Sequence, residues 1–370
     1  MKRGESPQRG KRTGFTTGAC AAAAARAAIT SLRNGTVPQQ VAVLLPNGAV
    51  VTFAVAEGSC TPTTARCVVI KDAGDDPDCT HGARLTAVVQ RLPDPIGAVM
   101  LRGGEGVGVV TRPGLGTPVG EPAINPTPRA NILENIRAAA GTILEQAGLE
   151  VTLSIPGGEE LARRTLNARL GITGGLSILG TTGIVYPYST AAYKEAVRQS
   201  VHAAAAMGLP AVVLTTGRRT ERFARGILVD LPESAFIQMG DFVGAALESV
   251  AATGMPQVIV AAMAGKLAKI GQGVANTHAH KVPLDMERVA YLAATVGAGA
   301  AELEQIRTGI TVRHAADILA KKGLTPVFYQ RLVSDVITAL YQRLPPSTRL
   351  EVLAFDAEGL LLAHIKAPTP

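Results

Sequence analysis

The first half of the chain combines one Ala-rich stretch with several short runs of apolar and β-branched residues. Residues 16–32, TTGACAAAAARAAITSL, predict a helix with an N-cap threonine, because alanine has the highest helix propensity. Residues 41–59, VAVLLPNGAVVTFAVAEGS, predict a β-hairpin that turns at the Pro-Asn-Gly of 46–48. Further strands are expected over 65–72, 83–92 and 149–158, and helices over 130–148 and 159–171. This pattern predicts an α+β domain.

The middle of the chain is dense in glycine and proline. Residues 101–129 read LRGGEGVGVVTRPGLGTPVGEPAINPTPR, which excludes a long helix and leaves one short expected strand, Val107 to Thr111. A connection this long without regular structure is uncommon unless it has a function. Glycine lets a large ligand approach the backbone, and Arg112 and Arg129 can bind carboxylates, so we expect part of a binding site here.

From about Gly171 the pattern changes to apolar runs that alternate with helical segments. Strands are expected within 175–183, 210–217, 235–240 and 256–265, and helices over 188–208, 218–228 and 241–254. The tail is mostly helical from residue 286 and ends in a strand pair, 350–356 and 360–365. Continuous apolar strands between helices predict a mostly parallel sheet covered on both faces. We therefore expect an α+β domain over residues 1–170 and an α/β, three-layer Rossmann-like domain over residues 171–370.

Composition and charge narrow the choice of partner. The 370 residues are 47% hydrophobic and only 4% aromatic, so two aliphatic cores are expected. The net charge of +7 fits an acidic partner such as nucleic acid, a membrane surface or a polyanionic small molecule. Because stacking aromatics are scarce and most basic residues are spread singly, we favour the small molecule over nucleic acid.

Cysteine usage and hydropathy indicate the compartment. The four cysteines form no C-x-x-C pair, which favours reduced thiols in a cytoplasmic protein. No signal peptide is recognised, and no apolar run approaches the roughly 20 residues of a membrane span. We expect no membrane partner and no nucleic-acid partner, and a homo-oligomer is compatible with the sequence.

One run, VIKDAGDDPDCTHGA at residues 69–83, concentrates acidic and metal-ligating side chains. Its aspartates do not follow the alternate spacing of an EF-hand loop. Cys79 and His81 alone are too few for zinc. The run is therefore either a polar loop at a strand end, with aspartates forming local turns, or an acid/base cluster.

Two segments at expected strand ends are candidate binding sites. Gly180 to Gly183, GTTG, offers backbone N–H groups and hydroxyls to an anion or a cofactor carboxylate, or is a plain tight turn. Asp241 either binds ribose hydroxyls or caps the following helix. Neither segment is a dinucleotide G-x-G-x-x-G, and the Ala-Gly-Lys at 264–266 lacks the rest of a Walker A loop.

The segment NTHAHK, residues 276–281, places His278 and His280 two residues apart. Alternation puts both on one face of a strand, which a metal would need. No third ligand is evident nearby, so loop histidines are the preferred interpretation and no metal site is expected.

Seven sequence motifs together resemble the motifs of one protein family. They are GFTTGACAAAAARAA, VIKDAGDDPDCTHGA, GGEGVGVVTRPGL, PVGEPAINPTPR, SILGTTGIVYPYS, MGDFVG and NTHAHK, and they cover the chain from Thr13 to about Lys281. The chain is similar to the cobalt-precorrin-5B C1-methyltransferase (CbiD) family of cobalamin biosynthesis. The resemblance implies S-adenosylmethionine-dependent methyl transfer to C1 of a ring-contracted tetrapyrrole, giving precorrin-6A or its cobalt form. It departs at NTHAHK, where NTHSRK is expected, which weakens a carboxylate-binding role for position 280.

The resemblance and the residue chemistry together give a set of expected site residues. The expected catalytic acid/base residues are Asp72, Asp75, Asp76 and His81. The expected S-adenosylmethionine-binding residues are Gly180, Thr181, Thr182, Gly183 and Asp241, at the carboxyl edge of the second sheet. The expected substrate-binding residues are Thr16, Thr17, Arg102, Glu105, Arg112, Glu121, Asn125, Arg129, Asn276 and His278. Two alternatives stay open: a non-enzymatic tetrapyrrole carrier or scaffold, and a phosphate- or nucleotide-binding enzyme.

Overall fold

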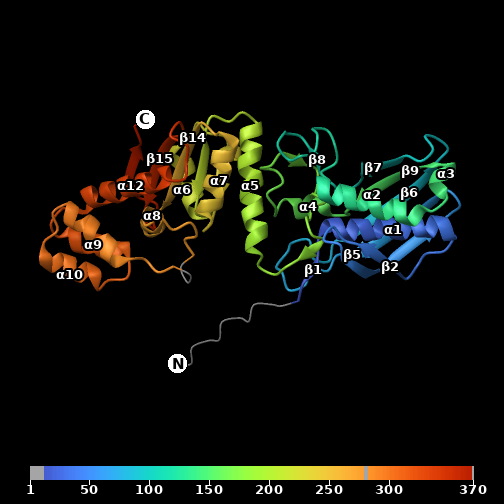
Figure 1. The fold of residues 1–370 in the computed structure, drawn as a ribbon, viewed down its shortest axis with the longest axis horizontal. Helices are drawn as coiled ribbons and strands as arrows, with labels where there is room; N and C mark the ends of the chain where they lie inside the picture. Colours follow the sequence, from blue (N-terminus) through green and yellow to red (C-terminus); the bar gives the residue numbers. More distant parts are fainter. Residues whose placement is uncertain (1–11, 279–281, 369–370) are drawn as a thin grey trace, which may run out of the picture. The chain divides into compact units, whose positions relative to one another are not determined.

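The computed structural model describes residues 12–278 and 282–368. The chain divides into two compact units, Met1–Thr190 and Ala191–Pro370. Each unit has its own five-stranded sheet and its own hydrophobic core (Figure 1). The protein is therefore a mixed α/β protein, and each unit is described by itself.

The first unit is built on a mixed sheet with the order β4-β5-β6-β9-β7. Its neighbours are antiparallel except β7 and β9, which are parallel. The strands are β4 (Glu57–Cys60), β5 (Thr64–Ile70), β6 (Arg84–Leu92), β9 (Gly148–Ser154) and β7 (Val99–Gly103). A separate hairpin, β2 (Gln40–Leu44) with β3 (Val50–Ala54), confirms the hairpin prediction.

The Ala-rich helix α1 (Thr17–Asn34) lies at the centre of this core. It packs against β5 and β6 and against helix α2 (Pro126–Ala140), and every alanine of α1 is buried. Small side chains let the backbones of helix and sheet approach closely while keeping the interior densely packed. Thr16 caps the helix by accepting the Ala19 N–H at 3.2 Å, which confirms the predicted helix and cap.

Two predicted helices are shorter than expected. The helix expected over 130–148 breaks at Gly141, where φ is 55°, into α2 and the short α3 (Ile143–Gln146). The helix expected over 159–171 is reduced to α4 (Gly158–Ala162). The segment leaves the helical path there, because the Asn167 side chain donates to the Gly175 carbonyl and accepts from the Ser177 hydroxyl.

The second unit holds a five-stranded sheet with the order β13-β12-β14-β15-β16. The first four strands are mutually parallel, and β16 is antiparallel to β15, so the predicted mostly parallel sheet is confirmed. Their bounds are β12 (Val212–Thr215), β13 (Phe236–Gln238), β14 (Gln257–Met263), β15 (Arg349–Phe355) and β16 (Leu361–Lys366).

Alternate residues of these strands are buried in two separate clusters, so both faces of the sheet are covered. Val258 and Val260 belong to a large core with the helices α5, α7, α8, α9, α10, α11 and α12. Ile259 and Ala261 belong to a smaller cluster with helix α6 and the turn η1. The helices and the turn are α5 (Thr190–Ala206), α6 (Arg218–Ile227), η1 (Glu233–Ala235), α7 (Val243–Thr253), α8 (Ala264–Gly271), α9 (Met286–Thr295), α10 (Ala300–Arg307), α11 (Val312–Ala320) and α12 (Thr325–Tyr341).

Residues 171–190 belong to the first unit, which extends past the expected boundary at residue 170. Strand β10 (Ile172–Thr173) pairs with β8 (Val109–Val110), and β11 (Ile184–Val185) pairs with β1 (Gly14–Phe15). The expectation that 175–183 contributes a strand to the parallel sheet is therefore wrong. Backbone pairing with the first unit at Leu176 and Ile178 holds this apolar run instead.

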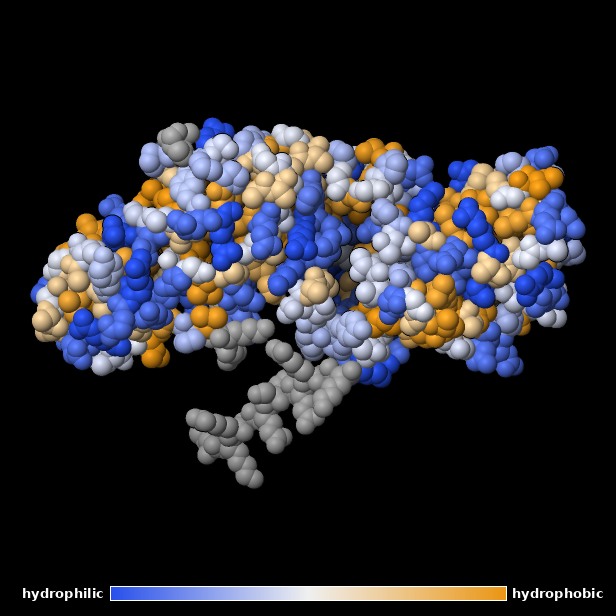
Figure 2. Space-filling model, in the orientation of Figure 1, coloured by the Kyte–Doolittle hydropathy of each residue, from blue (hydrophilic) through white to orange (hydrophobic). Residues whose placement is uncertain are grey.

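Within residues 12–278 and 282–368, no helix combines the length and the apolar character that a membrane crossing requires. Figure 2 shows hydrophilic and hydrophobic residues interspersed over the visible face.

Candidate active site

The start of helix α1 is the point where several motifs of the first unit meet. The Gly18 N–H donates to the Leu179 carbonyl at 2.9 Å, and the Leu179 N–H donates to Thr17 Oγ1 at 2.9 Å. The Asn125 N–H donates to the Ile178 carbonyl at 3.0 Å, which brings the segment before α2 to the same place. The structure thus brings together Thr17, Asn125 and the segment leading into Gly180.

Glycine is required where these segments touch. A Cβ on Gly18 would lie 2.7 Å from the Pro128 Cβ, and one on Gly180 would lie 2.3 Å from Thr16 Oγ1. Gly180 also has φ +133°, which L side chains rarely adopt. The Gly180–Gly183 loop therefore packs on the cap of α1, and its predicted position at the edge of the parallel sheet is wrong. Thr181 and Thr182 are exposed in this loop.

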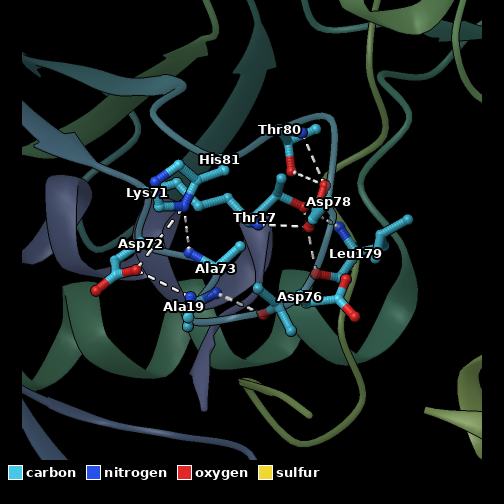
Figure 3. Close-up of polar contacts among 12 residues, drawn as sticks. Thr17, Ala19, Lys71, Asp72, Ala73, Asp76, Asp78, Thr80, His81 and Leu179 are labelled. Carbon is cyan, nitrogen blue, oxygen red and sulfur yellow. Dashed lines mark hydrogen bonds and ion pairs between the residues drawn. The ribbon is translucent and has the colours of Figure 1, made fainter. Parts of the chain in front are cut away.

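The acid loop, residues 71–82 between β5 and β6, starts with a buried lysine (Figure 3). The Lys71 side chain is 1% exposed, and its Nζ lies 2.6 Å from Asp78 Oδ2. The other Asp78 oxygen accepts the Thr80 N–H at 2.7 Å and the Thr80 hydroxyl at 2.6 Å. Burial alone raises the pKa of Asp78, but the bonds from Lys71 and Thr80 outweigh it, so the pKa is lowered.

Asp72 and His81 form a second group in the acid loop. Arg12 is hydrogen-bonded to Asp72 and, together with the Gly74 N–H, lowers the pKa of that carboxyl. His81 Nδ1 accepts the Ala73 N–H at 3.1 Å and lies 3.8 Å from Asp72 Oδ1. An accepting Nδ1 places the proton of the neutral imidazole on Nε2. The His81 side chain is 55% exposed, so that Nε2 can be reached by a ligand.

Asp75 and Asp76 bind other parts of the first unit. Asp75 Oδ2 accepts the Arg12 N–H at 2.9 Å, which fixes the chain before β1. Asp76 Oδ1 accepts the Tyr188 N–H at 2.8 Å. Tyr188 is the one non-glycine residue with a positive φ (55°) in the described part of the chain, and its side chain is exposed. Of the four predicted catalytic residues, Asp76 is thus engaged in holding an unfavourable backbone conformation.

The predicted substrate residues of the Gly-rich middle lie mostly on the surface. Arg102 pairs with Glu150 at 3.2 Å, and Glu105 and Glu121 are exposed while their carbonyls accept backbone N–H groups. Arg112 is exposed and Arg129 is half-buried. In the part of the chain that the structure describes, no hydrogen bond or ion pair joins Arg102, Glu105 or Glu121 to the acid loop.

A separate group of polar residues lies in the second unit, at the carboxyl ends of β13 and β14. Asp241 Oδ1 lies 2.8 Å from Lys266 Nζ and accepts the Thr277 hydroxyl at 3.0 Å. Burial raises the pKa of Asp241, but Lys266 and Thr277 oppose it and leave the pKa lowered. Asp241 is not a helix cap, because the N-cap of α7 is Phe242. The interpretation of Asp241 as a ligand-binding acid therefore stays open.

Two further predicted residues adjoin this group. Asn276 Oδ1 accepts the His278 N–H at 3.2 Å, and the charge of His278 contributes to the lowered pKa of Asp241. His280, the second histidine that a metal site here would need, lies outside the described residues. Among the described residues, no group of three or more His, Cys, Asp and Glu side chains could hold a metal ion.

Sequence reasoning missed three residues of these two groups. In the sequence, Lys71 directly follows an apolar run, Lys266 belongs to an Ala-Gly-Lys that resembles part of a nucleotide-binding motif, and Tyr188 begins a predicted helix. The signal for Lys71 was present, because a lysine directly after a buried strand and before several aspartates implies an ion pair.

Comparisons with known proteins identify the family. The family model described as CbiD matches residues 4–187, and the model for the CbiD C-terminal domain matches residues 276–365. The cobalt-precorrin-5B C(1)-methyltransferase of Dechloromonas aromatica is 54% identical over 97% of this chain and 92% of its own length. The protein of that name from Methylococcus capsulatus is 54% identical over 98% of this chain and 95% of its own length. A crystal structure of a cobalamin biosynthesis protein (cbiD) from Archaeoglobus fulgidus has 30% identity and a TM-score of 0.39, and covers 69% of this chain and 78% of that one.

A mixed sheet in the first unit and a mostly parallel sheet in the second define a two-unit mixed α/β protein. The chain belongs to the CbiD family.

Proposed function

We propose that this protein is a methyltransferase that adds a methyl group to C1 of cobalt-precorrin-5B in cobalamin biosynthesis, with S-adenosylmethionine as the donor and cobalt-precorrin-6A as the product. The observation that carries the proposal is identity of 54% to cobalt-precorrin-5B C(1)-methyltransferases over nearly the whole chain. The basic charge of the chain supports it, because the acetate and propionate groups of such a tetrapyrrole are anionic.

In this reaction the protein mainly has to align two reactants. C1 of the conjugated macrocycle is the carbon nucleophile, and the sulfonium of the donor supplies an electrophilic methyl group. The protein contributes proximity and orientation, and one side chain moves a proton as the conjugation rearranges.

The first unit offers the residues for that proton transfer. His81 carries its proton on the exposed Nε2, while its Nδ1 is fixed by the Ala73 N–H. To act as a base, the ring takes the tautomer with the proton on Nδ1, which turns from the Ala73 N–H to Asp72, 3.8 Å away. The exposed Nε2 then accepts the proton that the substrate loses, and Asp72, held ionised by Arg12, stabilises the imidazolium that forms. Asp78 and Asp76 are already committed to Lys71 and to the Tyr188 backbone. We therefore assign the proton transfer to His81, with Asp72 as its partner.

The second unit offers a place for the donor. We infer that its sheet is a three-layer Rossmann-like arrangement, in which ligands bind outside the carboxyl ends of strands where the strand order reverses. Here the chain runs from β12 to β13 on one side and then to β14 on the other, so the reversal lies between β12 and β14. A Cβ on Gly217 or Gly265, which follow these strands, would meet no atom within 4 Å, so a ligand can approach the backbone there.

The experiment that tests the function is a mass measurement. The protein is incubated with cobalt-precorrin-5B and S-adenosylmethionine that carries an isotope-labelled methyl group. The mass of the tetrapyrrole is measured by mass spectrometry before and after the incubation. The proposal expects a gain of one labelled methyl group, with S-adenosylhomocysteine as co-product. Binding of the pigment without any gain would contradict it and favour a carrier.

A variant pair tests the assignment of the proton transfer. His81→Ala should lower kcat by at least about 100-fold with little change in KM, because general acid-base groups contribute about that much. His202→Ala, on helix α5, is the matched control and should leave both constants unchanged. Equal kcat values for wild type and His81→Ala would remove His81 from the chemistry.

A further inference from the structure

An ion pair crosses the point where the strand order of the second unit reverses. Asp241 follows β13 and Lys266 lies in the first turn of α8, directly after β14. Strand β12 lies between β13 and β14 in the sheet. The 2.8 Å contact between Lys266 Nζ and Asp241 Oδ1 therefore reaches across the carboxyl end of β12, where an open α/β sheet binds its ligand.

The ion pair between Asp241 and Lys266 is partly open to solvent. The Lys266 side chain is 34% exposed and the Asp241 side chain 25% exposed, so both remain accessible from solvent. The two contacts described for the Asp241 carboxylate, from Lys266 and Thr277, both involve Oδ1. Within the described ranges, Oδ2 of Asp241 has no hydrogen-bond partner and is available to a hydroxyl. A partly exposed ion pair of this kind adds little to stability.

The chemistry of the pair matches two groups of one ligand. S-adenosylmethionine carries a vicinal ribose diol, which donates hydrogen bonds, and an amino-acid carboxylate, which accepts them. A carboxylate is the usual acceptor for a ribose diol in sheets of this type. An ammonium group is a strong donor to a carboxylate. Gly217 and Gly265 leave room for a ligand beside the pair.

We propose that Lys266 binds the amino-acid carboxylate of the methyl donor, and that the Asp241–Lys266 ion pair is the ligand-free state of this site. On binding, Asp241 exchanges Lys266 for the ribose diol, and Lys266 exchanges Asp241 for the ligand carboxylate. In both states Lys266 has a carboxylate partner and Asp241 has hydrogen-bond donors, so opening the pair leaves neither group without a polar partner. The inference rests on the proposed function and extends it to the binding mode of the donor.

Two non-reactive ligands separate the roles of the two residues. S-adenosylhomocysteine keeps both the ribose and the amino-acid carboxylate, whereas methylthioadenosine keeps the ribose and lacks the amino acid. Calorimetric titration of the full chain with each ligand gives both dissociation constants without a catalytic turnover. Lys322→Met is the matched control, because Lys322 forms an ion pair with Glu302 in the same unit, also at 2.8 Å.

Lys266→Met should weaken S-adenosylhomocysteine about tenfold or more and change methylthioadenosine less than about twofold, since a hydrogen bond between charged groups contributes that much. Asp241→Asn should weaken both ligands, and Lys322→Met neither. Circular dichroism and the midpoint of thermal unfolding check that each variant folds.

The inference is overturned if Lys266→Met weakens both ligands equally or leaves both unchanged. It is also overturned if Asp241→Asn leaves methylthioadenosine binding intact. Either result, combined with one labelled methyl group gained in the mass measurement, rejects this binding mode alone. If the wild-type protein binds no S-adenosylhomocysteine and transfers no methyl group, the proposed function itself is rejected.

Discussion

Lys71 Nζ lies 2.6 Å from Asp78 Oδ2, and the lysine side chain is 1% exposed while that of the aspartate is 23% exposed. Lys71 therefore depends on this ion pair more than Asp78 does. The carboxylate also has the Thr80 hydroxyl and N–H, but no other hydrogen bond to the ammonium group is described among residues 12–278 and 282–368. The pair closes the acid loop back onto the end of β5.

Removing either partner should destabilise the protein by different amounts. Asp78→Asn leaves a fully buried ammonium group without its counter-charge and should cost about 3–5 kcal/mol. Lys71→Met leaves a carboxylate that still has Thr80 and some water, and should cost about 1–3 kcal/mol. Urea unfolding of both single variants and of the double variant measures this. The double variant should lose less than the sum of the two. Strict additivity would show that the pair contributes no coupling.

The same pair predicts how stability depends on pH. The pKa of Asp78 is lowered below its ordinary value of 3.8 in the folded state. A carboxyl with a depressed folded pKa stabilises the fold above its unfolded pKa, and that contribution is lost as pH falls through the folded pKa. The free-energy difference between wild type and Asp78→Asn should therefore be constant near neutrality and shrink below about pH 4. A difference that grows on acidification would reverse the assigned sign.

Asp76 gives a prediction that separates positioning from proton transfer. Its Oδ1 accepts the N–H of Tyr188, whose φ of 55° is unfavourable for a residue with a side chain. Asp76→Asn keeps an acceptor oxygen and should keep most of the activity, whereas Asp76→Ala should raise KM severalfold, because the Tyr188 segment is released. A proton-transfer group would instead lose kcat in both variants to a similar degree. Steady-state kinetics of the pair measures this, with Tyr291→Ala, an equally exposed tyrosine of the second unit, as a surface control.

Gly180 gives a prediction about the packing of the loop against α1. Gly180→Ala adds a Cβ 2.3 Å from Thr16 Oγ1 at φ +133° and should cost about 2–4 kcal/mol, through displacement of the N-cap as well as backbone strain. Gly174→Ala has φ +77° with open space around it and should cost only about 1 kcal/mol. Chemical denaturation of both variants measures the difference. Equal losses would mean that the Thr16 contact adds nothing.

Local patterns predicted the regular elements well, because they depend on neighbours in sequence. The alanine run of α1, the hairpin around residue 47 and the alternation of helix and apolar strand after residue 210 each follow from propensity and burial period. The apolar run within 175–183 predicts a buried strand of the parallel sheet, and the structure contradicts this prediction. In this segment Leu179 donates a hydrogen bond to Thr17, and Ile178 pairs with Ile124. Both partners lie far away in the sequence, so no local pattern reveals these contacts.

In the candidate sites too, the sequence predicts single residues but not the long-range contacts between them. The sequence indicated the acid loop and Asp241, since charged residues at strand ends are visible in any window. It did not indicate that Asp76 holds Tyr188, or that Asp241 meets Lys266, because those contacts join residues 112 and 25 positions apart. Such pairs depend on strand order, which was established only by the structure.

The position of the transferred methyl group tests the central claim most directly. Cobalt-precorrin-5B is incubated with the protein and methyl-labelled S-adenosylmethionine, and the product is analysed by NMR correlation from the labelled methyl to the ring carbons. The account predicts one labelled methyl signal, bonded to C1. A label on any other ring atom, or an unlabelled tetrapyrrole after complete incubation, would contradict it.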